Sequence, residues 1–317
     1  MLPKTRMLDL ERQGYRIVGS HSAIKICMWT RQAIRGRDVC YKSTFYGINS
    51  HRCIQMTPAL PFCTHRCQMC WRDIEWTKAK WHGIIDEPKD IVDGCIKEHI
   101  QILQGFKGNK NASKELISES QKPLHFAISL SGEPTLYPKL PGLIKEIKKR
   151  KMTSFLVTNG TNPEMLRKLI KSENMPTQTY ITLPAPNEKI YNKICNPLIK
   201  GGWKKINESL NLLNKFPRST IRMTLVKDLN LINAEEYSKL IKMASPEFLE
   251  LKAYVWMGYS RHRLEKRNMP LHSEIKNFSK KISKLINYKT IDEKENSRVV
   301  LMKDYRHSMD AVKILPP

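Results

Sequence analysis

The segment CTHRCQMC, residues 63–70, holds three cysteines in the pattern CxxxCxxC. Three thiolates at this spacing can hold three corners of a 4Fe–4S cluster and leave the fourth iron open to a small molecule. An open position is what distinguishes a catalytic metal site from a closed structural one. The alternative is zinc, with His65 or a distant residue as the fourth ligand. The segment therefore predicts a metal centre, and its surroundings must decide between the two metals.

A second group of three cysteines lies upstream, with Cys27, Cys40 and Cys53 spaced thirteen positions apart. The two groups account for six of the eight cysteines in the chain. The upstream three are also consistent with buried core thiols, because cysteine is among the most buried residue types. Cys95 falls on the apolar stripe of a predicted helix and Cys195 near a helix end, so we expect both to be structural.

Length and composition indicate a folded protein of the cytoplasm. The chain has 317 residues, of which 40% are hydrophobic, enough for one large domain or two small ones with a sizeable core. It contains no apolar run of membrane-spanning length and no targeting pattern at its N-terminus, so we expect no membrane association. Cytoplasmic cysteines stay reduced, which favours metal ligands or core thiols over disulfides.

The charge balance is strongly basic. Lys and Arg number 55 against 30 Asp and Glu, which gives a formal net charge of +25. Part of such an excess is often a solvated, lysine-rich surface. A charge this large on a chain of this size favours a polyanionic partner, and binding of that kind should weaken steeply with salt.

Apolar segments alternate with amphipathic ones from about residue 51, whereas residues 1–50 lack a clean period. The predicted strands are 51–59, 124–131, 154–160, 177–184, 219–226, 248–257 and 297–304. The predicted helices are 88–106, 138–151, one beginning at Pro163, 187–194, 203–216, 234–244 and 272–285. This alternation implies a parallel sheet with right-handed crossovers. The predicted fold class is α/β, a partial (β/α)6-type TIM barrel with N-terminal and C-terminal extensions.

Four chemically distinctive loops each follow a predicted strand: CTHRCQMC, SGEP (131–134), TNG (158–160) and MGYS (257–260). In barrels of this kind the active site lies at the carboxyl ends of the strands. The order of the loops resembles the radical SAM superfamily, in which SGEP corresponds to a GGEP motif. The resemblance implies that Ser131, Gly132, Glu133, Thr158 and Asn159 contact S-adenosyl-L-methionine. Met69 takes the place of an aromatic residue that packs on adenine, a role that a polarisable thioether can fill.

The residues around both cysteine groups, CMW, VCYKSTFYG and HRCIQMTPALPFCTHRCQMCWRD, closely resemble the tRNA 4-demethylwyosine synthase family over residues 15–305 or so. This resemblance implies a lyase of wybutosine biosynthesis. Its substrate is N1-methylguanosine beside the anticodon of tRNA-Phe, and pyruvate donates two carbons. It also implies two 4Fe–4S clusters, one on Cys27, Cys40 and Cys53 and one on Cys63, Cys67 and Cys70. Lys42 is then the candidate catalytic residue, as an imine-forming amine.

The resemblance further suggests how the chain is divided and supplied with electrons. Residues 1–50 would be an N-terminal extension with two ligands of the second cluster, 51–305 the barrel and 306–317 a tail. The chain has no room for the flavodoxin-like domain of eukaryotic members, so we expect no FMN and an external low-potential electron donor. Nothing in the sequence indicates oligomerisation, so a monomer is expected.

Three tryptophans and several basic residues follow the cysteine loop directly. A helical face is one explanation, but a five-residue spacing does not keep one stripe of a helix. Aromatic and basic side chains beside an active-site mouth suit a flipped base and its flanking phosphates. The predicted tRNA-binding residues are Trp71, Arg72, Trp76, Lys78, Lys80 and Trp81. The alternatives are another radical SAM enzyme that modifies RNA or peptide, and a non-catalytic, zinc-stabilised RNA-binding protein.

Overall fold

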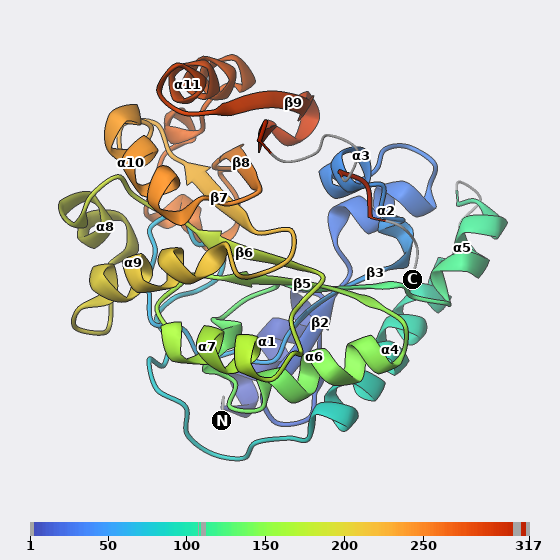
Figure 1. The fold of residues 1–317 in the computed structure, drawn as a ribbon. Helices are drawn as coiled ribbons and strands as arrows, with labels where there is room; N and C mark the ends of the chain where they lie inside the picture. The colour runs from blue at the N-terminus through green and yellow to red at the C-terminus, as the bar shows by residue number, and fades with distance from the viewer. Residues whose placement is uncertain (1–2, 107, 109–111, 307–311, 315–317) are drawn as a thin grey trace.

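The computed structural model describes residues 3–106, 108, 112–306 and 312–314 (Figure 1). Its strands form a single sheet in the order β1-β2-β3-β4-β5-β6-β7-β8-β10-β9. The six central strands are parallel and are β3 (Cys53–Thr57), β4 (His125–Ile128), β5 (Thr153–Thr158), β6 (Gln178–Thr182), β7 (Thr220–Leu225) and β8 (Phe248–Ala253). The predicted α/β fold with a partial six-stranded barrel is therefore confirmed.

Helices follow one another around the outside of the sheet (Figure 1). They are α4 (Pro88–Gln104), α6 (Leu140–Lys149), α7 (Pro163–Lys171), α8 (Glu188–Cys195), α9 (Gly202–Leu213), α10 (Ala234–Ala244) and α11 (His272–Leu285). Contacts run from α4 to α6, α7, α9, α10 and α11 in turn, as expected for right-handed crossovers between neighbouring parallel strands, whereas α8 lies outside this series. All seven lie within a few residues of the predicted ranges.

Alternate residues of the central strands face two different cores. Leu156 of β5 belongs to the large core between the sheet and the outer helices. Its neighbour Phe155 belongs to a second core on the inner side of the sheet, with Tyr180 and Phe248. The inner side is covered by α3 (Tyr41–Tyr46), which contributes Phe45 to that core. Burial on both faces explains why these strands read as short, nearly continuous apolar runs.

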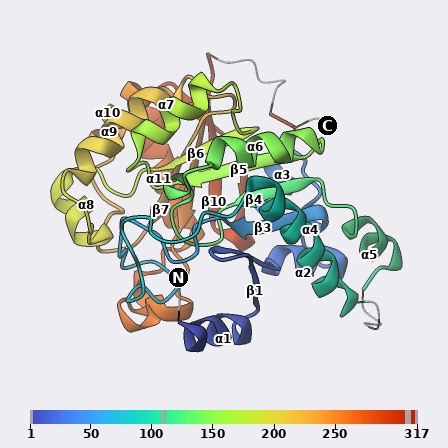
Figure 2. The same cartoon turned by 90° about the horizontal axis from the view of Figure 1, so that it is seen from below.

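The N-terminal segment joins the same sheet, which the sequence did not reveal. Strands β1 (Tyr15–Val18) and β2 (Ser22–Lys25) form an antiparallel hairpin, and β2 pairs with β3. Helix α1 (Lys4–Arg12) precedes the hairpin, and α2 (Met28–Ile34) follows it. In Figure 2, α1 lies at the edge of the molecule beside β1.

The opposite edge of the sheet is antiparallel as well. Strand β10 (Val299–Asp304) pairs with both β8 and β9 (Tyr288–Lys294), and only β10 was predicted. The short helix α5 (Lys114–Ser120) was also not predicted. Of the tail, Arg306 and residues 312–314 are described, and the Ile314 amide donates to the carbonyl oxygen of Tyr46 at 2.8 Å. The rest of the predicted tail lies outside the described residues. Among the described helices, none combines the length and apolarity needed to cross a bilayer.

Candidate active site

The CTHRCQMC loop follows the carboxyl end of β3 and lines a cavity of about 220 Å³. Cys63, Cys67 and Cys70 all contribute to its wall. The same wall contains the predicted cofactor-contacting residues Met69, Ser131, Gly132, Glu133, Thr158 and Asn159. Residues that lie far apart in the sequence therefore meet in one cavity, at the strand ends where the sequence predicted them.

Backbone hydrogen bonds on two sides hold the cysteine loop in place. The Cys63 amide donates to the carbonyl oxygen of Lys78 at 3.0 Å, and the Gln68 amide donates to that of Ile194 at 2.9 Å. On a third side, the Arg263 guanidinium donates to the carbonyl oxygens of Gln68 and Cys70. Such a clamp fixes the direction of the thiols before any metal binds.

Glu133 of the SGEP turn ties two strand ends together. It is 1% exposed, and its Oε1 accepts hydrogen bonds from the Thr135 amide at 3.0 Å and from the Thr135 and Thr158 hydroxyls, both at 2.6 Å. Its Oε2 accepts from the Asn159 amide at 2.7 Å. Buried polar atoms are normally hydrogen-bonded, and both oxygens of this carboxylate have partners. Glu133 therefore fixes the ends of β4 and β5 around the cavity that it also lines.

The Asn159 side chain connects the end of β5 to the cysteine loop. Its Nδ2 donates to the Thr64 hydroxyl at 2.9 Å and lies 3.8 Å from the Cys63 sulfur. Its Oδ1 accepts from the amide and the hydroxyl of Thr161 at 3.0 and 2.7 Å. With both ends of the amide occupied, the orientation of Asn159 relative to Cys63 is set.

Gly132 is needed where the SGEP turn touches the start of the cysteine loop. Its φ is +71°, and a Cβ there would lie 1.9 Å from the carbonyl oxygen of Ala59 and 2.8 Å from that of Phe62. The next residue, Glu133, donates its amide to the Phe62 carbonyl at 2.7 Å. The turn therefore packs backbone against backbone, where no side chain fits.

Gly132→Ala is expected to lower the free energy of unfolding by about 2–5 kcal/mol. The left-handed backbone costs an alanine about 1–2 kcal/mol, and overpacking against fixed backbone adds about 1–3 kcal/mol. Gly201→Ala is a matched control, because Gly201 has a φ of +65° and nothing within 4 Å of a built Cβ. Urea unfolding should show only about 1–2 kcal/mol of loss for the control. Equal losses in the two variants would contradict the packing argument.

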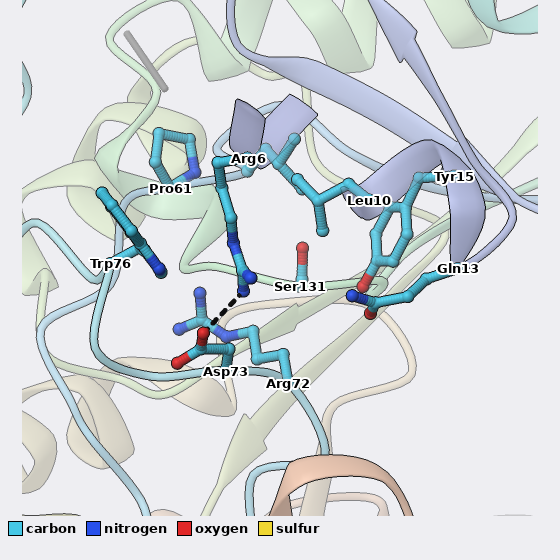
Figure 3. Close-up of a pocket in the computed structure, with 10 residues that line it drawn as sticks. Arg6, Leu10, Gln13, Tyr15, Pro61, Arg72, Asp73, Trp76 and Ser131 are labelled. Atoms are coloured by element: carbon cyan, nitrogen blue, oxygen red, sulfur yellow. Dashed lines mark ion pairs between the residues drawn. The ribbon is translucent and has the colours of Figure 1, made fainter. Parts of the chain in front are cut away.

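A smaller cavity lies next to the first and is closed by α1 (Figure 3). Arg6 of α1 forms an ion pair with Asp73 at 3.0 Å, directly after the cysteine loop. Arg72 and Ser131 line both cavities. Helix α1 is thereby attached to the wall of the cofactor cavity.

Burial and nearby charges have opposite effects on the pKa values of Cys63 and Arg72 at this site. Burial raises the pKa of the Cys63 thiol to about 12, although the nearby Arg72 lowers it. Burial by itself lowers the pKa of Arg72, but the Cys70 and Cys63 sulfurs outweigh it and raise that pKa. The arginine therefore stays charged and favours thiolates, the form in which cysteine binds metal.

The second triad lies inside the barrel. Cys27 and Cys40 are the N-cap residues of α2 and α3, and Cys53 is the first residue of β3. The three thiols are close enough to influence one another electrostatically, and burial raises the pKa of Cys40 to about 11 and of Cys53 to about 12. β3 has five residues, so at about 3.3 Å per residue roughly 16 Å of strand separates this triad from the cysteine loop.

Lys42 enters the inner core from α3. It is 7% exposed, and its Nζ lies 4.6 Å from the centroid of the Phe155 ring and 4.4 Å from that of Tyr180. Burial lowers its pKa, whereas the charges of Glu250 and Cys40 act in the opposite direction. The structure therefore places a buried amine two residues from a triad cysteine, where the sequence alone allowed a surface lysine.

Polar residues of β6, β7 and β8 surround Lys42 on the inner side of the sheet. The Glu250 carboxylate is fully buried, and its Oε1 accepts a hydrogen bond from the Tyr46 hydroxyl at 2.8 Å. Its Oε2, the Tyr180 hydroxyl and the Arg222 Nε have no hydrogen-bond partner among the described residues. Burial lowers the pKa of Lys252 to about 8, with Arg222 acting in the same direction. The Tyr180 hydroxyl and the Arg222 Nε are donors that a small buried anion would satisfy, whereas the Glu250 oxygen needs a donor.

The predicted tRNA-binding residues fall into two groups. Trp76, Lys78 and Lys80 are exposed, Trp76 by 43%. Trp81 is stacked on Phe62 with 4.4 Å between ring centroids. The other two, Trp71 and Arg72, are half-buried, the first stacked on Tyr15 and the second between the two cavities. The exposed three can reach RNA without rearrangement of the loop, and RNA contact stays a prediction for all six residues.

Sequence reasoning missed residues that reach the site from distant segments. Arg263, Glu250 and Arg222 were not singled out. Cys195 was expected to be structural, yet it lines the cavity of the first triad. The only sequence signal for Arg263 was its place just after the MGYS loop, at the end of a strand. Period and spacing carry no signal for the others.

Three cysteines at the end of the first parallel strand, a glycine turn and the polar ends of the next strands define a radical SAM protein, and residues 57–241 match the Radical SAM superfamily. The donor set fits a 4Fe–4S cluster with S-adenosylmethionine, since three thiols and the polar strand ends line the same cavity. Residues 243–304 match a family described as wyosine base formation. The chain belongs to the S-adenosyl-L-methionine-dependent tRNA 4-demethylwyosine synthase family.

Relatives with that name cover most of the chain. The protein from Pyrococcus horikoshii is 45% identical over 95% of this chain and 89% of its own length. The one from Methanocaldococcus jannaschii is 38% identical over 96% of this chain and 97% of its own length. A solved structure of TYW1 with a lysine–pyruvate adduct bound matches with a TM-score of 0.87 at 36% identity, over 100% of this chain and 99% of that one.

Proposed function

We propose that this chain converts N1-methylguanosine beside the anticodon of tRNA-Phe into 4-demethylwyosine, with pyruvate as the two-carbon donor. The observation that carries the proposal is the placement of two cysteine triads near the two ends of β3, with buried Lys42 beside the second. The names of the relatives and the lysine–pyruvate adduct in the TYW1 structure support the same reaction.

In this proposal the first triad holds the 4Fe–4S cluster that binds S-adenosylmethionine. Together they would supply the one-electron chemistry that removes a hydrogen atom from the N-methyl carbon of the base. The residues of the chain position that chemistry. Glu133 and Asn159 fix the strand ends, and Arg263 holds the loop carbonyls.

The second triad, Cys27, Cys40 and Cys53, would hold a second 4Fe–4S cluster, which we assign to pyruvate. The Nζ of Lys42 would attack the keto carbon of pyruvate, and loss of water would leave an imine. Burial favours the neutral amine that this attack needs. Arg222 and Lys252 supply positive charge for the pyruvate carboxylate, and Phe155 and Tyr180 limit the movement of the lysine.

The RNA would approach the carboxyl ends of the strands. The target base has to leave the stack of the anticodon loop, at a cost of a few kcal/mol. The net charge of +25 would offset part of this cost through phosphate contacts, and exposed Trp76, Lys78 and Lys80 beside the cysteine loop are our candidates for contact. We further propose a cytoplasmic, monomeric enzyme that receives electrons from a separate low-potential donor.

Iron counting tests the proposal. After anaerobic reconstitution the wild-type chain is expected to bind about eight irons and eight sulfides, the stoichiometry of two 4Fe–4S clusters. Cys40→Ala should bind about four of each, because only the first triad remains complete. The variant should still cleave S-adenosylmethionine under reducing conditions but yield no tricyclic base from methylated tRNA and pyruvate, as mass spectrometry of the nucleosides would show.

Cys95→Ala is the matched control, since Cys95 is buried on α4 outside both triads, and it should keep about eight irons. Formation of the tricyclic base by Cys40→Ala would remove the second cluster from the proposal. About four irons in the wild-type chain would do the same. Zinc without iron in the reconstituted protein would instead favour the non-catalytic RNA-binding alternative.

A further inference from the structure

Cys195 belongs to neither triad, yet it lies against the cysteine loop. It is the last residue of α8 and is buried. One ligand atom each from His65, Cys67 and Cys195 forms a group in which all three atoms lie within 4.8 Å of one another. Two thiols and an imidazole are the donors that zinc prefers in proteins.

Backbone pairing fixes this arrangement. The Arg66 amide donates to the carbonyl oxygens of Cys195 at 3.0 Å and Asn196 at 3.2 Å, and the Gln68 amide donates to Ile194. His65 also forms an antiparallel bridge with Pro197. The end of α8 is thus hydrogen-bonded to the loop on both sides of Cys67. The closeness of the two sulfurs follows from the backbone and does not depend on one side-chain rotamer.

The imidazole of His65 has an outer hydrogen-bond partner, as metal-bound histidines usually do, and here that partner is a tyrosine hydroxyl. The His65 Nε2 lies 2.8 Å from the Tyr191 hydroxyl, which leaves Nδ1 as the nitrogen available to a metal. Tyr191 is itself buried, and a Cβ at Gly202 would lie 2.1 Å from its hydroxyl. A hydrogen bond of this kind sets the tautomer and the ring orientation of a ligating histidine.

We propose that, in the cluster-free chain, His65, Cys67 and Cys195 bind one Zn²⁺ ion, with the fourth tetrahedral position open. Metal–ligand distances of about 2.0–2.3 Å require donor atoms roughly 3.5–4 Å apart, so movements of about 1 Å complete the site. Binding releases the two thiol protons: Zn²⁺ and two thiols give a zinc dithiolate and two H⁺. Because Cys67 is shared, zinc and the first 4Fe–4S cluster exclude each other.

Cobalt titration of the cluster-free, full-length chain under anaerobic conditions tests this site. Wild type should bind one Co²⁺ tightly, with the ligand-field bands of a tetrahedral ion and a charge-transfer intensity typical of two thiolates. Zn²⁺ should displace that cobalt. Cys195→Ser should weaken this binding at least about 100-fold, because loss of even an outer-shell partner costs 10–100-fold. Tyr191→Phe should weaken it by about 10-fold.

Two cysteine controls separate this site from the triads. Cys95→Ser and Cys40→Ser should leave the tight cobalt site unchanged, since neither residue belongs to it. An unchanged spectrum and affinity in Cys195→Ser would overturn the proposal. Loss of the tight site in both the Cys63→Ser and the Cys70→Ser variants would also overturn the proposal. Such a loss would mean that the metal is held by the CxxxCxxC motif alone.

If circular dichroism shows that Cys195→Ser folds poorly, two further measurements test the zinc site. His65→Gln removes the third ligand from the loop side and should show the same loss of affinity, whereas tight binding in that variant would contradict the site. Wild type loaded with one Zn²⁺ should take up about four fewer irons on reconstitution, the content of one cluster. Full iron uptake with the zinc retained would also contradict it.

Discussion

Cys63→Ala is expected to lose about four of the eight irons proposed for the reconstituted chain and to form 5′-deoxyadenosine from S-adenosylmethionine at least about 1,000-fold more slowly. Two thiolates cannot hold a cluster that three normally fix. The loss also disturbs the polar network, because the Cys63 sulfur lies 3.8 Å from the Asn159 amide nitrogen. Iron and sulfide analysis, and chromatography of the nucleoside after reduction with dithionite, measure the two effects.

Comparison of Cys63→Ala with Cys40→Ala distinguishes the roles of the two triads. Both variants should bind about four irons, but only Cys63→Ala should lose cleavage of S-adenosylmethionine. The reason is geometric, since Cys63 lines the cavity that contains the SGEP turn, and Cys40 lies beneath the inner side of the sheet on α3. If Cys40→Ala lost cleavage and Cys63→Ala kept it, the assignment of the two triads would have to be reversed.

Local pattern was sufficient for the central part of the fold. Apolar residues recur at helical spacing throughout the segment 234–244, and α10 has the same bounds. In the parallel strands, both faces are buried, so apolar runs such as 219–226 stand out, and β7 lies within that range. The carboxyl ends of parallel strands share one edge of a sheet, which is why the loops after them could be expected to meet.

The segments that the sequence did not reveal are short or depend on distant partners. Helices α2 and α3 have seven and six residues, too few for an amphipathic period to be recognised. β9 has the sequence YKTIDEK, with several polar, exposed residues, because it is an edge strand with only β10 as a neighbour. The position of β9 in the sheet is determined by its pairing with β10, and its own composition hardly indicates a strand.

The same distinction applies to the site. Cysteines at fixed spacing carry their own signal, whereas Cys195 and Arg263 act through contacts with a loop more than a hundred residues away in the chain. Their roles depend on how α8 and the segment after β8 pack on the loop. Single-sequence reasoning therefore finds cysteines at a recognisable spacing and misses residues whose place beside the loop depends on how distant segments pack.

Lys42→Met is expected to lower the rate of formation of the tricyclic base at least about 1,000-fold. Both clusters and the cleavage of S-adenosylmethionine should persist. Methionine has a similar length and is apolar, so it can occupy the space beside Phe155 and Tyr180 without burying a new charge. It has no amine to attack pyruvate. Incubation with pyruvate and borohydride, followed by mass spectrometry of the protein, should show a reduced adduct on the wild type and none on the variant.

Lys149→Met is the matched control, because Lys149 is an exposed lysine on α6, far in the chain from both triads. It should keep the adduct, the iron content and the product. Persistence of the adduct in Lys42→Met would move the imine to another amine, and Lys252 is the next candidate, since burial lowers its pKa to about 8. A product yield in Lys42→Met within tenfold of wild type would show that pyruvate reacts without a covalent lysine. The Tyr180 hydroxyl and the Arg222 Nε, which have no hydrogen-bond partner among the described residues, would then be the donors that hold it.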